Sequence, residues 1–287
     1  MPEIPIIDTH VHLWDPQRFR MSWTDGNALL ARPYSVEHYH EQTGELPIEG
    51  MVFVECGVEP PYAFLEARWA VACARQDARI QGIVAAAPVE FGLRARTYLE
   101  ALIELDEQRI KGVRRNLQDE PDPNMCLQPD FVQGVQLLAE YGLSFDICIY
   151  HHQLPAVIEL VRRCPDTQFI LDHLGKPDAR AHQLDPWRGQ IRELAALPNV
   201  ACKVSGLVTE ADHANWQPAD LEPYITHVLE TFGEDRVAFG GDWPVLLLAS
   251  SYTRWVETLW ALSASLPERA RHKLWHENAK RIYRLAT

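Results

Sequence analysis

The chain has 287 residues, a length that fits either two small domains or one large α/β barrel. It carries 27 basic and 40 acidic side chains, a formal net charge of −13, so we expect no binding to nucleic acid or anionic membranes. Its six cysteines include no C-x-x-C pair, which is typical of reduced thiols in the cytoplasm. Neither a membrane-length apolar run nor a cleavable signal is visible. The sequence therefore predicts an unprocessed, soluble cytoplasmic protein.

Short apolar runs rich in β-branched residues alternate with stretches of helical spacing. The runs predict eight strands, over residues 4–13, 51–56, 80–89, 110–114, 143–150, 168–174, 200–204 and 237–241. Helices are expected from Ser35 onward and over residues 62–75, 94–105, 131–141, 154–163, 187–197, 221–232 and 252–262. Because the strands are apolar on both faces, they suit a parallel sheet covered by helices. The predicted fold is a single (β/α)₈ TIM barrel that spans residues 1–287.

Two histidines stand two residues apart at the end of the first predicted strand. Side chains in a strand alternate between its faces, so Asp8, His10 and His12 are expected to share one face. His10 and His12 are then able to meet one metal ion or one substrate. The alternative is an exposed strand end that carries two polar residues.

The other predicted strands also end in polar side chains, which a buried sheet does not favour. In a barrel the carboxyl ends of the strands converge on one mouth, so we expect these side chains to form one site. On the fifth strand the alternation favours His152 over His151 as the inward residue, although both stay candidates, as do Arg114 and Arg115 on the fourth. The polar residues at the strand ends are Glu55, Arg114, Arg115, Asp146, Tyr150, His151, His152, Asp172, His173, Lys203, Ser205 and Asp242.

Three long connections follow strand ends, at residues 14–34, 116–130 and 206–220. Barrels build their active sites from such loops. The aromatic residues Trp14, Trp23, Tyr34 and Trp216 lie in them or at their edges. Each aromatic side chain is expected either to line a pocket or to pin its loop onto the barrel.

Seven segments spread over nearly the whole chain carry a family resemblance: 8–12 (DTHVH), 111–114 (KGVR), 152–155 (HQLP), 171–177 (LDHLGKP), 203–207 (KVSGL), 239–244 (FGGDWP) and 277–283 (ENAKRIY). Together they resemble the amidohydrolase superfamily, in its amidohydrolase-related group. The segments at 171–177 and 239–244 look like its sugar-lactonase branch. The resemblance implies hydrolysis of an aldonolactone, of the L-fuconolactone type, to the open-chain sugar acid.

The resemblance also bears on metal binding. Relatives with two metal ions place a carboxylated lysine or a glutamate at the end of the fourth strand, where this chain has Arg114 or Arg115. A cation there opposes a second ion. We therefore expect at most one divalent ion, zinc, bound by His10, His12 and Asp242. Whether turnover requires this ion is left open.

The hydrolysis of a lactone needs a water nucleophile, stabilisation of an oxyanion and a proton for the leaving oxygen. We expect Asp242 to accept the proton from water and return it to the ring oxygen. His152, His173 and Arg114 are expected to polarise the carbonyl group. Substrate binding is assigned to Trp23, Glu55, Arg115, His151 and Lys203.

Three other functions compete with this hypothesis. The same superfamily contains metal-dependent decarboxylases, which also use H-x-H and an aspartate on the eighth strand, and a pyrone-dicarboxylate lactonase. A catalytically inactive barrel that binds a ligand is the alternative outside enzymes. It is disfavoured because charged groups occupy every expected site position, where apolar residues would stabilise a scaffold better. The sequence leaves the oligomeric state open.

Overall fold

The computed structural model describes residues 3–286, which fold around one sheet of eight parallel strands. The strands are hydrogen-bonded in the order of the sequence. Between the last strand and the first, the amide of Asp242 donates to the carbonyl of His10 (2.8 Å) and that of His12 to the carbonyl of Trp243 (2.7 Å). The strands are β1 (Ile6–Val11), β2 (Ile48–Val54), β3 (Ile80–Ala86), β4 (Ile110–Arg114), β5 (Ser144–Ile147), β6 (Phe169–Leu171), β7 (Val200–Val204) and β8 (Val237–Phe239).

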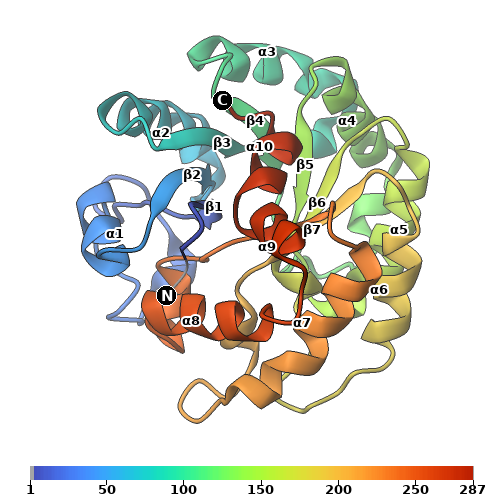
Figure 1. Cartoon of the computed structure of the whole chain (residues 1–287). Helices are drawn as coiled ribbons and strands as arrows, with labels where there is room; N and C mark the ends of the chain where they lie inside the picture. The colour runs from blue at the N-terminus through green and yellow to red at the C-terminus, as the bar shows by residue number, and fades with distance from the viewer. Residues whose placement is uncertain (1–2, 287) are drawn as a thin grey trace.

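Helices follow the strands and form a ring outside the sheet (Figure 1). The predicted (β/α)₈ barrel is therefore confirmed. Three helical segments near the C-terminus were not anticipated: α9 (Glu268–His272), a π-helical turn over Lys273–Glu277, and α10 (Asn278–Tyr283). The helices are α1 (Val36–Thr43), α2 (Ala63–Gln76), α3 (Arg96–Leu105), α4 (Pro129–Glu140), α5 (Leu154–Arg163), α6 (Trp187–Ala195), α7 (Pro218–Phe232), α8 (Tyr252–Leu262), α9 (Glu268–His272) and α10 (Asn278–Tyr283).

The sheet is buried on both faces, as its continuous apolar strands predict. Outward-facing residues such as Phe145 and Phe169 pack in the large core between sheet and helices. Inward-facing residues such as Val54, Ile170 and Ala238 form a second, smaller core inside the barrel. All six cysteines are free thiols, as expected. Between residues 3 and 286, no helix combines the length and the apolar character that crossing a bilayer requires.

The first strand departs from the expected alternation. The register between β1 and β2 shifts between Asp8 and Val11, which is the mark of a β-bulge. The Asp8 carboxylate consequently faces the helix layer, where it accepts hydrogen bonds from the hydroxyls of Tyr39 (3.0 Å) and Tyr252 (2.7 Å). His10 instead contacts groups inside the barrel. The prediction that Asp8 shares the face of the two histidines is wrong, because the extra residue of the bulge breaks the period of two.

One helix contact supports the loop after β3, which carries side chains of the pocket described below. Gly134 of α4 packs directly on the backbone of Val89, at the start of that loop. A methyl group at Gly134 would overlap the carbonyl oxygen of Val89 and lie 2.7 Å from its carbonyl carbon. The absence of a side chain at this position therefore permits the close approach of loop and helix.

We expect Gly134→Ala to lower the free energy of unfolding by about 1–3 kcal/mol, since overpacking outweighs the gain in helix propensity. Chemical denaturation measures the change. Gly189→Ala in α6 is the matched control, because a methyl group there meets open space, and it should leave stability unchanged or raise it by up to about 1 kcal/mol. Equal effects of the two substitutions would contradict the packing argument.

Candidate active site

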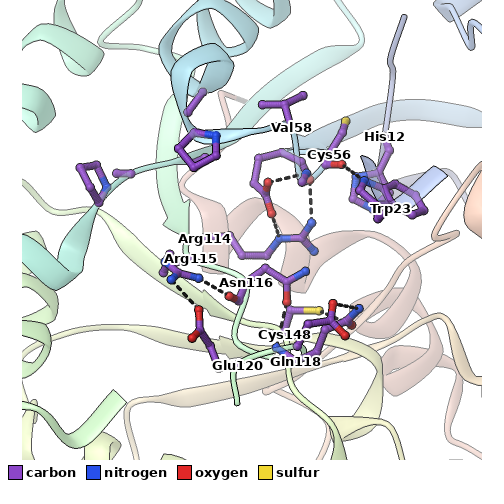
Figure 2. A pocket seen from close by; sticks show the side chains of 18 of the residues that line it. His12, Trp23, Cys56, Val58, Arg114, Arg115, Asn116, Gln118, Glu120 and Cys148 are labelled. Atoms are coloured by element: carbon purple, nitrogen blue, oxygen red, sulfur yellow. Dashed lines mark hydrogen bonds and ion pairs between the residues drawn. The ribbon is translucent and has the colours of Figure 1, made fainter. Parts of the chain in front are cut away.

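A cavity of about 830 Å³ opens at the carboxyl ends of the strands, where barrels hold their active sites (Figure 2). Of the three long connections singled out in the sequence, those at 14–34 and 116–130 contribute to its lining, and the one at 206–220 does not. The loops after β2 and β3 contribute as well, which the sequence did not indicate. Polar members of the lining include His12, Trp23, Glu55, Glu90, Arg114, Arg115, Gln118, Glu120, His173, Lys176 and Asp242.

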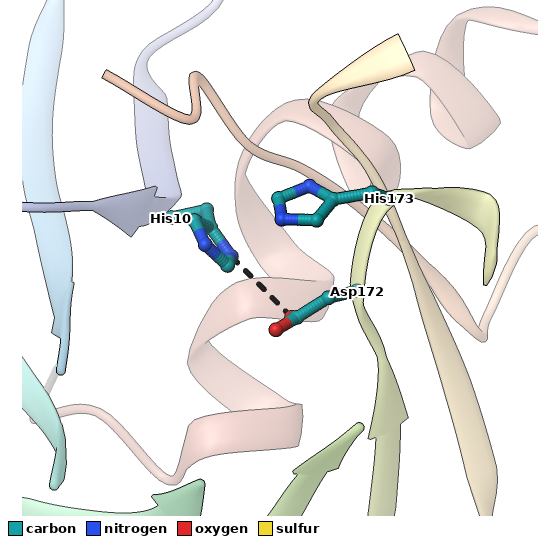
Figure 3. A group of neighbouring side chains, drawn as sticks. All are labelled: His10, Asp172 and His173. Carbon is teal, nitrogen blue, oxygen red and sulfur yellow. Dashed lines mark ion pairs between the residues drawn. The ribbon is translucent and has the colours of Figure 1, made fainter. Parts of the chain in front are cut away.

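Three imidazoles and one carboxylate converge at the bottom of this cavity. The Nε2 atoms of His10 and His12 lie 3.1 Å apart. Asp242 Oδ1 lies 3.5 Å from Nε2 of His12, 3.7 Å from Nε2 of His10 and 3.8 Å from Nε2 of His173. All four side chains are buried. Strands β1, β6 and β8 therefore bring their polar ends together as the sequence predicts. Figure 3 shows His10 facing His173 and Asp172, which come from the same segment.

The backbone at two of these residues is unusual. His173 and Asp242 have φ angles of +54° and +56°, in the left-handed region that residues with a side chain seldom adopt. The amide of Asp242 donates to the carbonyl of His10, and its own carbonyl accepts from Leu246 (2.8 Å). Such local strain persists only where the surrounding structure holds it, and it concentrates at functional sites.

Burial and neighbouring charges determine the protonation of the cluster. Burial lowers the pKa of His10 well below its usual value and that of His173 to about 4. Burial alone would raise the pKa of Asp242, but the surrounding histidines outweigh it and hold that pKa below its ordinary value. At neutral pH the site therefore presents an ionised carboxylate beside the neutral imidazoles of His10 and His173, which is the state that a general base or a metal site requires.

The donor set fits one divalent ion. Ligands about 2.0–2.1 Å from a tetrahedral zinc ion lie about 3.3 Å from one another, close to the separations among His10, His12 and Asp242. The Nδ1 of His12 faces the carbonyl of Val54 at 2.9 Å, an outer partner of the kind that orients metal-binding imidazoles. Arg114 Nη1 lies 3.4 Å from His10 Nε2 and opposes a second ion there.

The arginine and lysine side chains of the lining all have polar partners. Arg114 donates to Glu55 Oε1 (2.6 Å) and to Asp172 Oδ2 (3.2 Å). Arg115 donates to carboxylates of two different loops, those of Glu90 (3.0 Å) and Glu120 (2.6 Å), and the second of these bonds is visible in Figure 2. The third cation, Lys176, donates to Gln118 Oε1 (2.7 Å) and lies 3.8 Å from Glu210. The charged groups in the walls of the cavity are thus locally neutralised.

Comparison with known proteins places the chain in a family. The model of the amidohydrolase family matches residues 7–285. The chain belongs to the amidohydrolase family. An L-fucono-1,5-lactonase from Burkholderia multivorans is 35% identical over 97% of this chain and 96% of its own. An L-rhamnono-gamma-lactonase from Scheffersomyces stipitis is 24% identical over 99% of this chain and its own full length. The predicted family is confirmed, and these relatives are hydrolases of cyclic esters, the predicted enzyme class.

A solved structure of an amidohydrolase from Burkholderia multivorans superimposes on this chain with a TM-score of 0.88. Its sequence is 32% identical, and the match covers 98% of this chain and all of the other. One crystal form of that protein contains bound HEPES and another contains bound zinc. The zinc ion is bound by that protein. The nitrogen and oxygen donors of His10, His12 and Asp242 in this chain are of the kind that bind zinc.

The structure does not bring two expected residues of this amidohydrolase to the cavity. β5 ends at Ile147, and residues 151–153 form a 3-10 helix, so the strand alternation does not extend to His152. The side chain of His152 is exposed and does not line the cavity, and the prediction that it faces the site is wrong. His151 is half-buried outside the lining, with Nδ1 3.1 Å from the carbonyl oxygen of Lys176.

The sequence also predicts the wrong position for the side chain of Lys203. Its side chain is fully buried below the histidines, with Nζ 2.7 Å from Asp146 Oδ2 and 2.9 Å from Asp172 Oδ1. It does not line the cavity, so the expectation that it contacts substrate is wrong. Two buried carboxylates attract the ammonium group inward, and the sequence alone does not reveal that they lie on its side of the sheet.

Most of the remaining candidates line the cavity. Glu55, Arg114 and Arg115 do so, which means that both arginines at the end of β4 face the site. His10 is fully buried beside His12 and does not itself line the cavity. Trp23 lies at the rim, 44% exposed, and its indole N–H donates to the carbonyl of Cys56 (2.9 Å, Figure 2). Trp216 instead pins its loop, since its N–H donates to the carbonyl of Ala249 (2.8 Å).

Several residues of the site were missed. Asp172 was noted as a polar strand end without a role; it does not line the cavity but contacts Arg114 and Lys203 beside it. Lys176 lines the cavity and lies in the 171–177 segment, which was a usable signal. The other missed lining residues lie in loops and their spacing carries no signal of a common site: Glu90, Gln118 and Glu120.

One glycine leaves room for the side chains of His173 and Asp242. Gly206 has a φ of +59°, and a Cβ there would lie 2.7 Å from Cγ of His173 and 2.8 Å from Oδ2 of Asp242. We expect Gly206→Ala to displace both side chains and to lower kcat/KM by about 10²-fold, the cost of a misplacement near 1 Å. Gly142→Ala is the matched control, with a φ of +63° and open space around it. It should lose stability but keep kcat/KM; equal losses of activity would contradict the steric argument.

Proposed function

We propose that this amidohydrolase hydrolyses a neutral sugar lactone, of the aldonolactone type, to the open-chain sugar acid. The observation that carries the proposal is the ionised Asp242 beside the neutral imidazoles of His10 and His173, in a cavity whose cations are already paired. The names of the relatives, which act on L-fucono- and L-rhamnono-lactones, support the same chemistry.

The paired cations favour a neutral substrate over an anionic one. A dicarboxylate lactone or the carboxylate of a decarboxylase substrate needs free positive charge for its anionic groups. Arg114 and Arg115 already hold carboxylates, and Lys176 holds an amide, so an anionic substrate would have to displace these partners. Sugar hydroxyls both donate and accept, which suits a wall of paired ions and amides. This argument favours the sugar lactone over the pyrone-dicarboxylate lactone and over decarboxylation.

Asp242 is assigned the proton transfers. It takes a proton from water as the water oxygen bonds to the lactone carbonyl carbon, and it delivers that proton to the ring oxygen when the ring C–O bond breaks. The product carboxylic acid then ionises. Such general base catalysis is worth about 10²–10⁴-fold in rate.

His173 and Arg114 are assigned to the developing oxyanion. The Ser205 hydroxyl lies 2.9 Å from His173 Nδ1, and when it donates there, the hydrogen of the neutral imidazole is on Nε2 and directed at the site. Each donor of this kind contributes about 10²–10³-fold. A divalent ion held by His10, His12 and Asp242 would polarise the carbonyl as a Lewis acid when bound. Trp23, Glu55 and Arg115 are assigned to the sugar ring and its hydroxyls.

A panel of lactones tests the proposal. Aldono-1,4-lactones and aldono-1,5-lactones are supplied with a pH indicator, beside a dicarboxylate lactone, with and without a chelator. We expect hydrolysis of at least one neutral lactone and none of the anionic one. Hydrolysis of only the anionic lactone, or carbon dioxide release from a carboxylic acid in a reaction that the chelator abolishes, would overturn the assignment.

Asp242→Asn should lower kcat on that lactone by about 10²-fold or more, because the amide accepts no proton. Asp119→Asn is the matched control, since this exposed carboxylate lines the rim of the same cavity without contacting the histidines. The control should change kcat little. Full turnover by the Asp242 variant would remove this residue from the mechanism.

The pH dependence follows from the directions of the pKa shifts. Asp242 is already ionised well below neutrality, and His173 gains a proton only near pH 4. Protonated His173 would pair with Asp242 and remove its basicity. We therefore expect kcat/KM to be level from about pH 5.5 to 7.5 and to fall as the pH decreases toward 4. Initial rates corrected for spontaneous hydrolysis measure the profile, and an inflection near pH 6.5 would contradict it.

A further inference from the structure

The two walls of the cavity differ in their chemistry. The segments after β4 and β6 contribute polar side chains such as Gln118, Glu120 and Lys176. The segments after β2 and β3 contribute a wall that is mostly apolar, with the side chains of Val58, Pro60, Ala63, Ala87, Pro88 and Phe91. Figure 2 shows Val58 across the cavity from Gln118 and Glu120, with Arg114 between them. A ligand that fills the cavity therefore meets an apolar surface on one side only.

The apolar wall ends at an exposed aromatic ring. Phe91 lines the cavity with its side chain 54% exposed, whereas His12, His173 and Asp242 at the bottom are 3–4% exposed. Phe91 therefore lies at the mouth. Covering its phenyl ring with an apolar group removes surface from water and is favourable. A ligand that extends from the bottom along this wall would provide that cover.

The backbone around Phe91 holds its ring at the mouth. The amide of Phe91 donates to the carbonyl of Pro88 (3.0 Å), and its carbonyl accepts from Nε of Arg94 (3.3 Å). The next residue, Gly92, has a φ of +62°, and a Cβ there would lie 3.2 Å from the carbonyl oxygen of Asp130 in α4. The loop is thus packed closely on α4. A wall that is already in place loses little conformational entropy when a ligand binds.

A monosaccharide lactone fills only part of this cavity, whose volume is about 830 Å³. Such a lactone has roughly 12 non-hydrogen atoms and occupies on the order of 200 Å³, if each atom takes about half of the ~30 Å³ of a water molecule. The lactone ring must reach Asp242 at the bottom for the proton transfers. The space that remains lies toward the mouth, where Phe91 is exposed.

The chemistry of the remaining space favours an apolar group. Arg115 pairs with Glu90 and with Glu120, so this part of the cavity offers no unpaired cation to an anionic group. A second sugar ring would place hydroxyls against Val58 and Phe91, which cannot form hydrogen bonds with them. An alkyl or aryl group loses no hydrogen bond in the same place.

We propose that the substrate is a lactone whose ring carries an apolar substituent, an alkyl or aryl group, which binds along the wall after β2 and β3 as far as Phe91. The inference rests on the proposed lactonase function, in which the ring itself occupies the bottom of the cavity. Val58, Pro88 and Phe91 then determine which substituent is accepted, while Asp242 acts on the ring.

Isothermal titration calorimetry with cyclic lactams tests this binding without turnover. The probes are δ-valerolactam and its derivatives with a butyl, hexyl, phenyl or glucosyl group on the carbon beside the ring nitrogen, which keep the carbonyl group but resist hydrolysis. We expect the affinity to increase about two- to fourfold for each methylene group up to hexyl. The comparison of hexyl with phenyl distinguishes alkyl from aryl substituents. Equal affinity for all probes, or tightest binding of the glucosyl derivative, would overturn the proposal.

Substitutions in the apolar wall locate the binding of the substituent. Phe91→Ala should weaken binding of the hexyl lactam about tenfold and that of the unsubstituted lactam less than about twofold. Leu93→Ala is the matched control, because Leu93 is 58% exposed in the same loop but does not line the cavity, and it should change neither affinity. Val58→Thr keeps the shape of the side chain and adds a hydroxyl, and it should weaken hexyl binding about threefold or more. Equal effects of Phe91→Ala and Leu93→Ala would contradict the proposal.

Kinetics with lactones that carry the same substituents link this site to the reaction. We expect kcat/KM to follow the order of the lactam affinities, and Phe91→Ala to raise KM for the hexyl lactone more than for the unsubstituted one. If lactams bind in the expected order but no lactone is hydrolysed, the lactonase assignment fails and the apolar binding site remains. If neutral lactones are hydrolysed but neither affinity nor kcat/KM depends on the substituent, this inference fails and the lactonase assignment remains.

Discussion

The pairing of buried charges inside the barrel is the constraint on which the site depends. Lys203, Asp146 and Asp172 have no exposed side-chain surface, and Glu55 and Arg114 are 3–4% exposed. An ionised group isolated in such an interior costs many kcal/mol, so the fold is stable only if every charge has a close partner of opposite sign. The observed contacts of 2.6–3.2 Å meet this condition. Because these contacts join strands β4, β5, β6 and β7, they also hold the walls around His10 in register.

Charged side chains in the wall of the cavity are paired in the same way, and this pairing affects which substrates the cavity binds. Arg115 joins the loops after β3 and β4 through two carboxylates, and Lys176 joins the loop after β6 to Gln118. The loops are thereby tied together, and their charges are neutralised before a substrate enters. At the bottom of the cavity, Asp242 is ionised with histidines and without an arginine or lysine salt-bridge partner among the described residues, which concentrates the basicity at the bottom of the site on one carboxylate.

The two ends of the barrel differ in structure, and the buried charged residues between them link the two ends through hydrogen bonds and ion pairs. At the mouth, His173 and Asp242 are held in left-handed backbone conformations against Gly206, so their side chains meet where regular strand geometry would separate them. At the other end, α10 fills the interior with apolar side chains and one hydroxyl. A barrel with small inward residues such as Ala201 and Ala238 needs such a filling, since an empty interior loses packing contacts. The hydroxyl of Tyr283 then extends the inner charges to the C-terminus.

The sequence by itself determined the eight strands, the parallel barrel and the strand-end candidates His10, His12, Arg114, His173 and Asp242, because apolar periodicity and chain order are local properties. It did not determine the bulge that turns Asp8 outward, the 3-10 turn that exposes His152 or the burial of Lys203. Local alternation extends only as far as a strand does, and strand ends are decided by pairing with neighbours. The hydrogen-bond partners of Arg115 and Tyr283 could also be identified only from the tertiary structure. Charge pairing acts between side chains that are distant in sequence, so only the folded barrel decided which candidates line the cavity and which hold others in place.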